Sequence, residues 1–170
     1  MLRDEFQNMK GKRIDFDKNC RELAVKLRRH EHGRSTMQLI IALAEVPNSV
    51  VAEELKVAGF EIERAKLLWA EVTSEYESYT FMSGFLVSGT GDALRISEYS
   101  KGVGARSKCE AINFGNSEVR LEHLLLAVLH KHRSHAYRLL TKLNVNQQRL
   151  QNRLKARMKE SNGLALSPCD

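Results

Sequence analysis

Leu124-Leu-Leu-Ala-Val-Leu129 is the stretch that decides the fold, because the same apolar pattern stands 85 residues earlier (124 − 39 = 85) as Leu39-Ile-Ile-Ala-Leu-Ala44. At this offset residues 39–69 align with residues 124–154 without a gap, although only five of the 31 pairs are identical. Conserved physical character over so many positions indicates an internal repeat. The sequence therefore predicts a tandem of two similar helical units.

Both copies continue in the same way after the apolar run. Ser49 and Ser134 occupy equivalent positions, and serine is a favourable residue at the start of a helix. Gly59 and Asn144 are also equivalent, and these two residue types best tolerate the left-handed turn that ends a helix. We therefore expect an all-α protein, a pseudo-twofold repeat of two four-helix units.

Helical periodicity and breaker residues predict the helices of each unit. In the first unit we expect a helix that opens at Phe16-Asp17 and ends near residues 30–33, then helices over 37–45 and 49–58, and a longer one that carries Ala65 and Trp69. In the second unit we expect helices over about 97–114, 120–130, 134–143 and 146–160. Gly102 and Gly104 each cost a helix about 1 kcal/mol relative to alanine, so we expect a kink or partial unwinding there.

The composition of the chain predicts its organisation. We expect a charged leader over 1–13 and one domain over 14–160. Within that domain we place repeat 1 over about 14–81, a Ser-Gly-rich linker over 82–93 and repeat 2 over about 94–160, followed by a flexible tail over 161–170.

Several classes of protein are disfavoured by composition. No apolar run approaches the 18 or so residues that a membrane span needs, and the first residues lack the build of a signal peptide. Cys20, Cys109 and Cys169 are an odd number without metal-type spacing, which indicates reduced thiols in the cytoplasm.

Catalytic, cofactor and metal motifs are not found in the sequence. No Gly-x-x-x-x-Gly-Lys-Ser/Thr motif occurs, so the chain cannot cradle ATP phosphates by that route. Histidines cluster at His130, His132 and His135, but residues two apart on a helix do not share a face, and no carboxylate lies nearby in the sequence. We interpret them as exposed loop residues, and we expect no enzyme, no cofactor and no metal site.

Positive charge is concentrated between residues 131 and 159, which contain nine Lys or Arg and no Asp or Glu. Three explanations stay open: a solvated outer helix face, a site for an acidic protein partner, and a nucleic-acid site. The third has the least support, because no aromatic residue that could stack on a base lies among the cations of the last predicted helix.

Three segments together resemble a known family. They are Leu94-Arg-Ile-Ser97, then Val119-Arg-Leu-Glu-His-Leu-Leu-Leu-Ala127, and Ala136-Tyr-Arg-Leu-Leu140 with Leu143-Asn-Val145. They resemble the Clp N-terminal (Clp repeat) domain, whose most specific element is matched in full by Glu122-His-Leu-Leu-Leu126. The first unit resembles it more weakly. Phe16-Asp17 stands for the opening pair and Met37-Gln-Leu-Ile-Ile41 for the Glu-His element, and these two points are about five residues closer together than in the second unit.

The resemblance implies a bundle of about eight helices and a role in protein docking. In some domains of this family the opening Thr/Ser and the Glu of Glu-His frame a pocket for a phosphorylated arginine, which assigns Ser97 and Glu122 to such a pocket here. The competing interpretation is that Ser97 caps a helix and Glu122 is a solvated first-turn acid. Asp17 would repel a phosphate and Met37 cannot pair with a guanidinium, so the first unit should hold no such pocket.

Two functions remain from the sequence. The first is a non-catalytic docking module of the Clp unfoldase or protease system, with a Clp ATPase, the Clp protease core, an adaptor or a client as its partner. The alternative is a helical nucleic-acid-binding protein that uses residues 131–159.

Overall fold

The computed structural model describes residues 14–28, 36–71, 98–132 and 134–163. The predicted leader, linker and most of the tail lie outside these residues, as does Ser97, so the predicted domain boundaries stay predictions. The elements in chain order are β1 (Asp15–Phe16), α2 (Lys18–Arg28), α3 (Thr36–Ala44), α4 (Val50–Val57), α6 (Glu98–Asn113), β2 (Glu118–Val119), α7 (Leu121–Leu129), α8 (His135–Lys142) and α9 (Gln147–Gly163). Residues 62–71 are also helical.

The helix bounds reproduce the offset of 85. Shifting α3 by 85 residues gives the bounds of α7, and shifting α4 gives those of α8. The equivalent serines behave alike, because the hydroxyls of Ser49 and Ser134 accept backbone N–H groups in the first turns of α4 and α8. Gly59 (φ 88°) and Asn144 (φ 57°) both adopt the left-handed conformation, which ends the preceding helix. The predicted all-α repeat is confirmed.

The units differ at their first helix. With the offset applied, α2 and α6 end together, but α6 begins five residues earlier, so the extra residues of the second unit lengthen α6. The expected unwinding at Gly102 and Gly104 was wrong, because α6 is helical through both. A side chain at Gly102 would collide with the ammonium end of Lys131, so a glycine there lets this lysine pack against α6.

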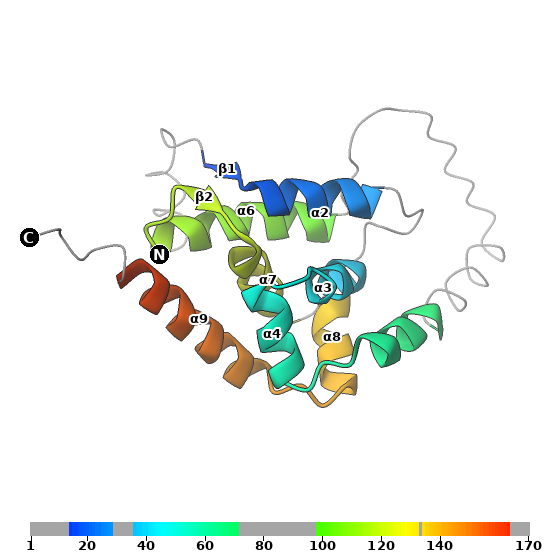
Figure 1. The fold of residues 1–170 in the computed structure, drawn as a ribbon. Helices are drawn as coiled ribbons and strands as arrows, with labels where there is room; N and C mark the ends of the chain where they lie inside the picture. Colours follow the sequence, from blue (N-terminus) through cyan, green and yellow to red (C-terminus); the bar gives the residue numbers. More distant parts are fainter. Residues whose placement is uncertain (1–13, 29–35, 72–97, 133, 164–170) are drawn as a thin grey trace, which may run out of the picture.

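The two units share a single core. Helix α3 packs against α7 and α8, and α4 packs against α7 and α9, so each unit covers the other (Figure 1). The buried Thr36 Oγ1 accepts the N–H of Ala136 at 3.1 Å, which joins the start of α3 to α8. Helix α7 lies at the centre, and its residues other than Glu122 are all buried. Figure 1 shows α9 and the helix over 62–71 on opposite sides of this centre.

A short parallel strand pair joins the beginning of the first unit to the second. Phe16 of β1 is in register with Val119 of β2, and the Asp17 N–H donates to the Val119 carbonyl at 2.9 Å. This pair brings the start of α2 beside the start of α7. None of the helices in the described ranges is both long and apolar enough to cross a bilayer.

Candidate docking surfaces

The starts of α2 and α7 form the first candidate surface. The Asp17 carboxylate accepts the Cys20 N–H at 2.7 Å and so caps α2. Burial raises the pKa of the Cys20 thiol, and the charges of Asp17 and Glu122 raise it further. Both carboxylates therefore lie close to one thiol, although they belong to different units. Burial and these two negative charges hold the Cys20 thiol in its unreactive protonated form.

This arrangement bears on the phosphoarginine-type pocket predicted from Ser97 and Glu122. Glu122 lies half-buried in the first turn of α7, beside the opening residues of the first unit. Ser97 lies outside the described residues, so the pocket stays a prediction. Met37 is buried in α3 and exposes only 4% of its surface. The neighbourhood of Glu122 thus includes an acid, Asp17, that sequence reasoning had assigned to a separate site.

His123 supports the start of α7 from within. Its side chain is completely buried. Its Nδ1 accepts the Arg120 N–H at 2.9 Å, and its Nε2 lies 3.1 Å from Asn116 Oδ1. Two such contacts require a neutral ring with its proton on Nε2. Burial, together with the Arg120 charge, lowers the pKa of His123 to about 4.

The buried histidine predicts a pH dependence of stability. Between its ordinary pKa of 6.5 and about 4, the unfolded chain binds a proton at His123 that the folded chain does not. Stability is therefore complete above pH 6.5 and falls as the pH drops toward 4, with a total loss of roughly 3 kcal/mol from this group. Urea unfolding at pH 7, 6, 5 and 4 measures the slope.

The controls for this effect are two variants and a direct titration. His123→Gln should flatten part of the slope, whereas His132→Gln, which alters an exposed histidine, should keep it. NMR of the wild-type imidazole rings provides a readout that needs no variant. A His123 ring that takes up its proton near pH 6.5 in the folded chain would contradict the prediction.

We expected all three clustered histidines to lie in an exposed loop, but His130 does not. His130 follows α7, and its Nε2 lies 3.3 Å from the buried Glu110 of α6. Burial lowers the pKa of His130 despite that carboxylate. The fold thus supplies an acid that the local sequence lacks, and Arg106 also binds it at 2.8 Å. Within the described ranges, no group of three or more His, Cys, Asp or Glu is arranged to hold a metal ion.

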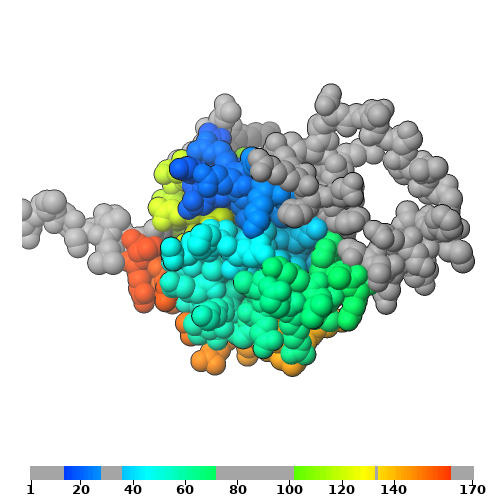
Figure 2. Space-filling view, turned by 45° about the vertical axis from the view of Figure 1, so that its right-hand side comes forward, coloured from blue at the N-terminus to red at the C-terminus, as the bar shows by residue number. Residues whose placement is uncertain are grey.

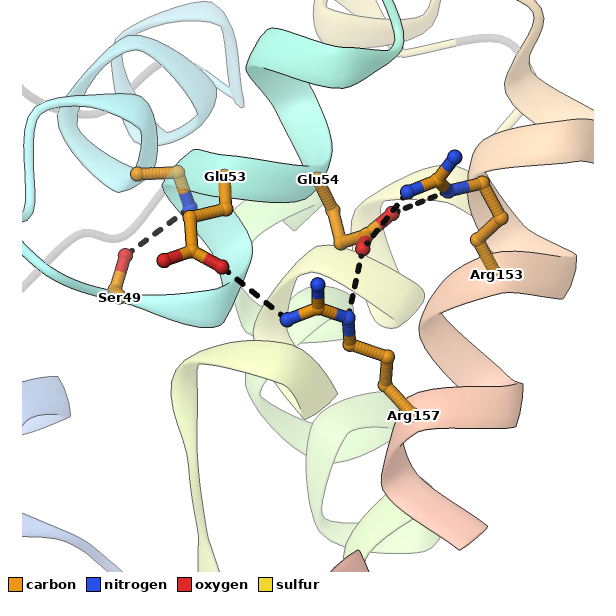
Figure 3. Close-up of polar contacts among 6 residues, drawn as sticks. Ser49, Glu53, Glu54, Arg153 and Arg157 are labelled. Carbon is orange, nitrogen blue, oxygen red and sulfur yellow. Dashed lines mark hydrogen bonds and ion pairs between the residues drawn. The ribbon is translucent and has the colours of Figure 1, made fainter. Parts of the chain in front are cut away.

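The second candidate surface is the α4–α9 cluster, defined by Glu53, Glu54, Arg153 and Arg157 (Figure 3). Glu54 is 1% exposed and accepts from Arg153 Nε at 2.7 Å and from Arg157 Nε at 3.0 Å. Arg157 Nη1 also donates to Glu53 at 3.2 Å. The hydrogen bond to Glu54 raises the pKa of Arg153. Two arginines of the basic region are therefore neutralised inside the chain.

The sequence contained a signal for this cluster that we did not use. The offset of 85 makes Glu54 equivalent to Leu139, and Arg153 equivalent to Leu68. The leucines belong to or pack against the core, so the second unit has leucine where the first has a buried acid. Glu54 and Arg153 carry opposite charges at two positions that are both leucine in the other unit, which indicates an ion pair between them. Arg153 and Arg157 therefore remain partly exposed, but they are paired with acids of the first unit.

The family of the second unit follows from a comparison with known families. Residues 95–165 match the family model of the Clp repeat (R) N-terminal domain. The second unit is similar to the Clp repeat over these residues. The matched span includes α6, β2, α7, α8 and α9, and therefore the Glu122-His-Leu-Leu-Leu126 element at the centre of the fold. The first unit lies outside the match, and its likeness to the second unit rests on the offset of 85. No curated protein sequence matches the chain.

Proposed function

We propose that this chain is a docking module of the Clp unfoldase or protease system, acting in the cytoplasm. A Clp repeat N-terminal domain is a non-catalytic protein-interaction module of Clp systems, and its match over 95–165 is the observation that carries the proposal. The partner we propose is a Clp ATPase, the Clp protease core, or an adaptor or client of either. Cys20 and Cys109, the cysteines in the described ranges, form no disulfide, which fits a reducing compartment.

The architecture supports a role through contact. The specific element of the repeat is almost entirely buried in α7, so it stabilises the domain and leaves recognition to the surrounding helices. Binding energy at protein interfaces comes from a few surface residues, so we expect partner affinity to rest on side chains of the outer helices.

The cluster argues against the nucleic-acid alternative. A phosphate backbone is bound by a continuous set of free cations. In α9 the side chains of Arg153 and Arg157 are held by Glu54, and the exposed Glu53 lies beside them. These contacts interrupt the row of charge that a duplex would need.

Co-purification tests the proposed function. The chain, tagged and purified from its own cells, should retain a Clp ATPase, the protease core or a Clp adaptor, and the purified component should bind it directly. Retention of the Clp component should fall much less with rising salt concentration than the binding of a nucleic acid through several phosphates would. Failure to retain any Clp component would refute the assignment.

The phosphoarginine-type pocket is a finer proposal with its own prediction. Glu122→Ala combined with Ser97→Ala should weaken binding of a phosphoarginine peptide by roughly tenfold or more, through loss of charge-assisted hydrogen bonds. The melting temperature should change little, because Glu122 is half-exposed. Titration calorimetry measures the affinity.

The control for this pocket lies at Asp17. Asp17→Ser keeps an oxygen that can cap α2 but removes a negative charge near Glu122, so the variant should bind the peptide at least as well as the wild-type chain. If neither the wild-type chain nor the Asp17→Ser variant gives a heat of binding with the peptide, the pocket hypothesis is refuted, whereas the proposed Clp docking function is not affected.

A further inference from the structure

The α4–α9 cluster is incomplete at one end. Arg149, Arg153 and Arg157 are spaced by four residues, so they form one row along α9. Arg157 binds Glu53 and Glu54, and Arg153 binds Glu54, which places the row against α4. The guanidinium of Arg149 meets no carboxylate among the described residues. The row thus has three cations, and α4 supplies acids for two.

The turn of α4 on the Arg149 side of the cluster ends in an exposed apolar side chain. The pairing runs in opposite directions along the two helices, so the turn of α4 that follows Glu54 lies toward Arg149. Figure 1 shows the end of α4 and the start of α9 meeting at the same end of the molecule. In Figure 2 orange atoms border the cyan and green atoms of the first unit there. That turn of α4 carries Lys56 and Val57, and Val57 is 61% exposed.

From this geometry we infer that the open end of the cluster, formed by Arg149, Val57 and Lys56, docks a segment of a partner protein that carries a carboxylate next to an apolar side chain. The carboxylate completes the row by pairing with Arg149, as Glu54 does with Arg153. The apolar side chain covers Val57. This inference rests on the proposed docking function and assigns it a surface and a partner chemistry.

Charge complementarity favours a protein segment over a nucleic acid. A single free guanidinium beside an exposed valine suits one carboxylate with an apolar neighbour, and Glu53 of the same cluster would repel a run of phosphates. The end of α4 offers no aromatic ring for base stacking, since its last turn contains only Glu54, Leu55, Lys56 and Val57.

The repeat provides a matched control. The offset of 85 makes Arg64 equivalent to Arg149, and both are exposed arginines two positions into their helices. Val57, however, is equivalent to Lys142. The second site therefore has a cation in place of the valine, and it should not accept an apolar neighbour. Arg149→Ser and Arg64→Ser remove the same group from the same kind of position.

The test uses a capped peptide of alternating leucine and glutamate, its glutamine counterpart and a short DNA duplex, each titrated into the full chain by proton–nitrogen correlation NMR. We expect the acidic peptide to shift the amide signals of Lys56, Val57 and Arg149 saturably. Arg149→Ser should weaken its binding roughly tenfold, and Arg64→Ser should leave it unchanged.

Four results would overturn the inference: equal binding of the glutamine peptide, equal losses in both arginine variants, tighter binding of the duplex at the same residues, or no binding of the acidic peptide. The retention experiment separates these failures from the proposed function. If Arg149→Ser still retains its Clp component as the wild-type chain does, docking stands and this surface is not where it occurs.

Discussion

Replacing Arg153 and Arg157 together with methionine is expected to lower the free energy of unfolding by about 3 kcal/mol. The double variant leaves the carboxylate of Glu54, which is 1% exposed, without a cation. Removal of the partners of a buried charge typically costs about 3–5 kcal/mol, and we place this case at the lower end because both arginines border solvent, so water can approach the carboxylate. Urea unfolding at pH 7 measures the loss.

A triple variant is the control for this prediction. Adding Glu54→Leu to the double variant removes the stranded charge and should restore most of the stability. The repeat supports this expectation, because Leu139 occupies the equivalent position in the second unit and is buried. A double variant as stable as the wild-type chain, or a triple variant as unstable as the double, would show that Glu54 does not need its cations.

Leu125→Ala is the second change with a large expected effect. Leu125 lies in α7 with no exposed surface, so its truncation should lower the free energy of unfolding by about 2–5 kcal/mol. Ile40→Ala in α3 should behave similarly, because the offset makes the two positions equivalent and Ile40 is equally buried. Denaturant unfolding of both variants tests the shared core.

An exposed leucine provides the comparison. Leu67 is 67% exposed, and Leu67→Ala should change the free energy of unfolding by less than about 0.5 kcal/mol. A loss below about 1 kcal/mol for Leu125→Ala would mean that the central apolar run is not the core of the molecule.

Much of the fold could be predicted because local physical rules and the repeat agree. Ser49 and Gly59 bound α4 through capping and a left-handed turn, and both effects act within a few residues. The same rules applied 85 residues later gave α8 with its bounds, so one copy checks the other. Gly102 was misjudged because its local penalty does not break α6, and the side chain of Lys131 that lies against it comes from almost 30 residues away.

The candidate sites were harder to predict because they form between the units. Glu54 and Arg153 are 99 residues apart, and nothing in the neighbourhood of either residue indicates the other. The same holds for Glu110, which reaches His130 from a different helix. The cations of α9 were interpreted as a solvated face, whereas Arg153 and Arg157 pair with acids of the other unit. Only the comparison of the two copies, position by position, could have shown where a leucine had been replaced by a charge.

The β1–β2 pair has a consequence for how the chain is made. Strand β1 is synthesised before its partner β2 and the buried helix α7, which emerge about 100 residues later. Contacts between distant parts of a chain slow folding, because the entropy of closing a long loop is lost before those contacts can stabilise the structure. On the ribosome the first unit therefore waits with part of its apolar surface uncovered until the second unit emerges, a period in which a chaperone that binds apolar surface would find it.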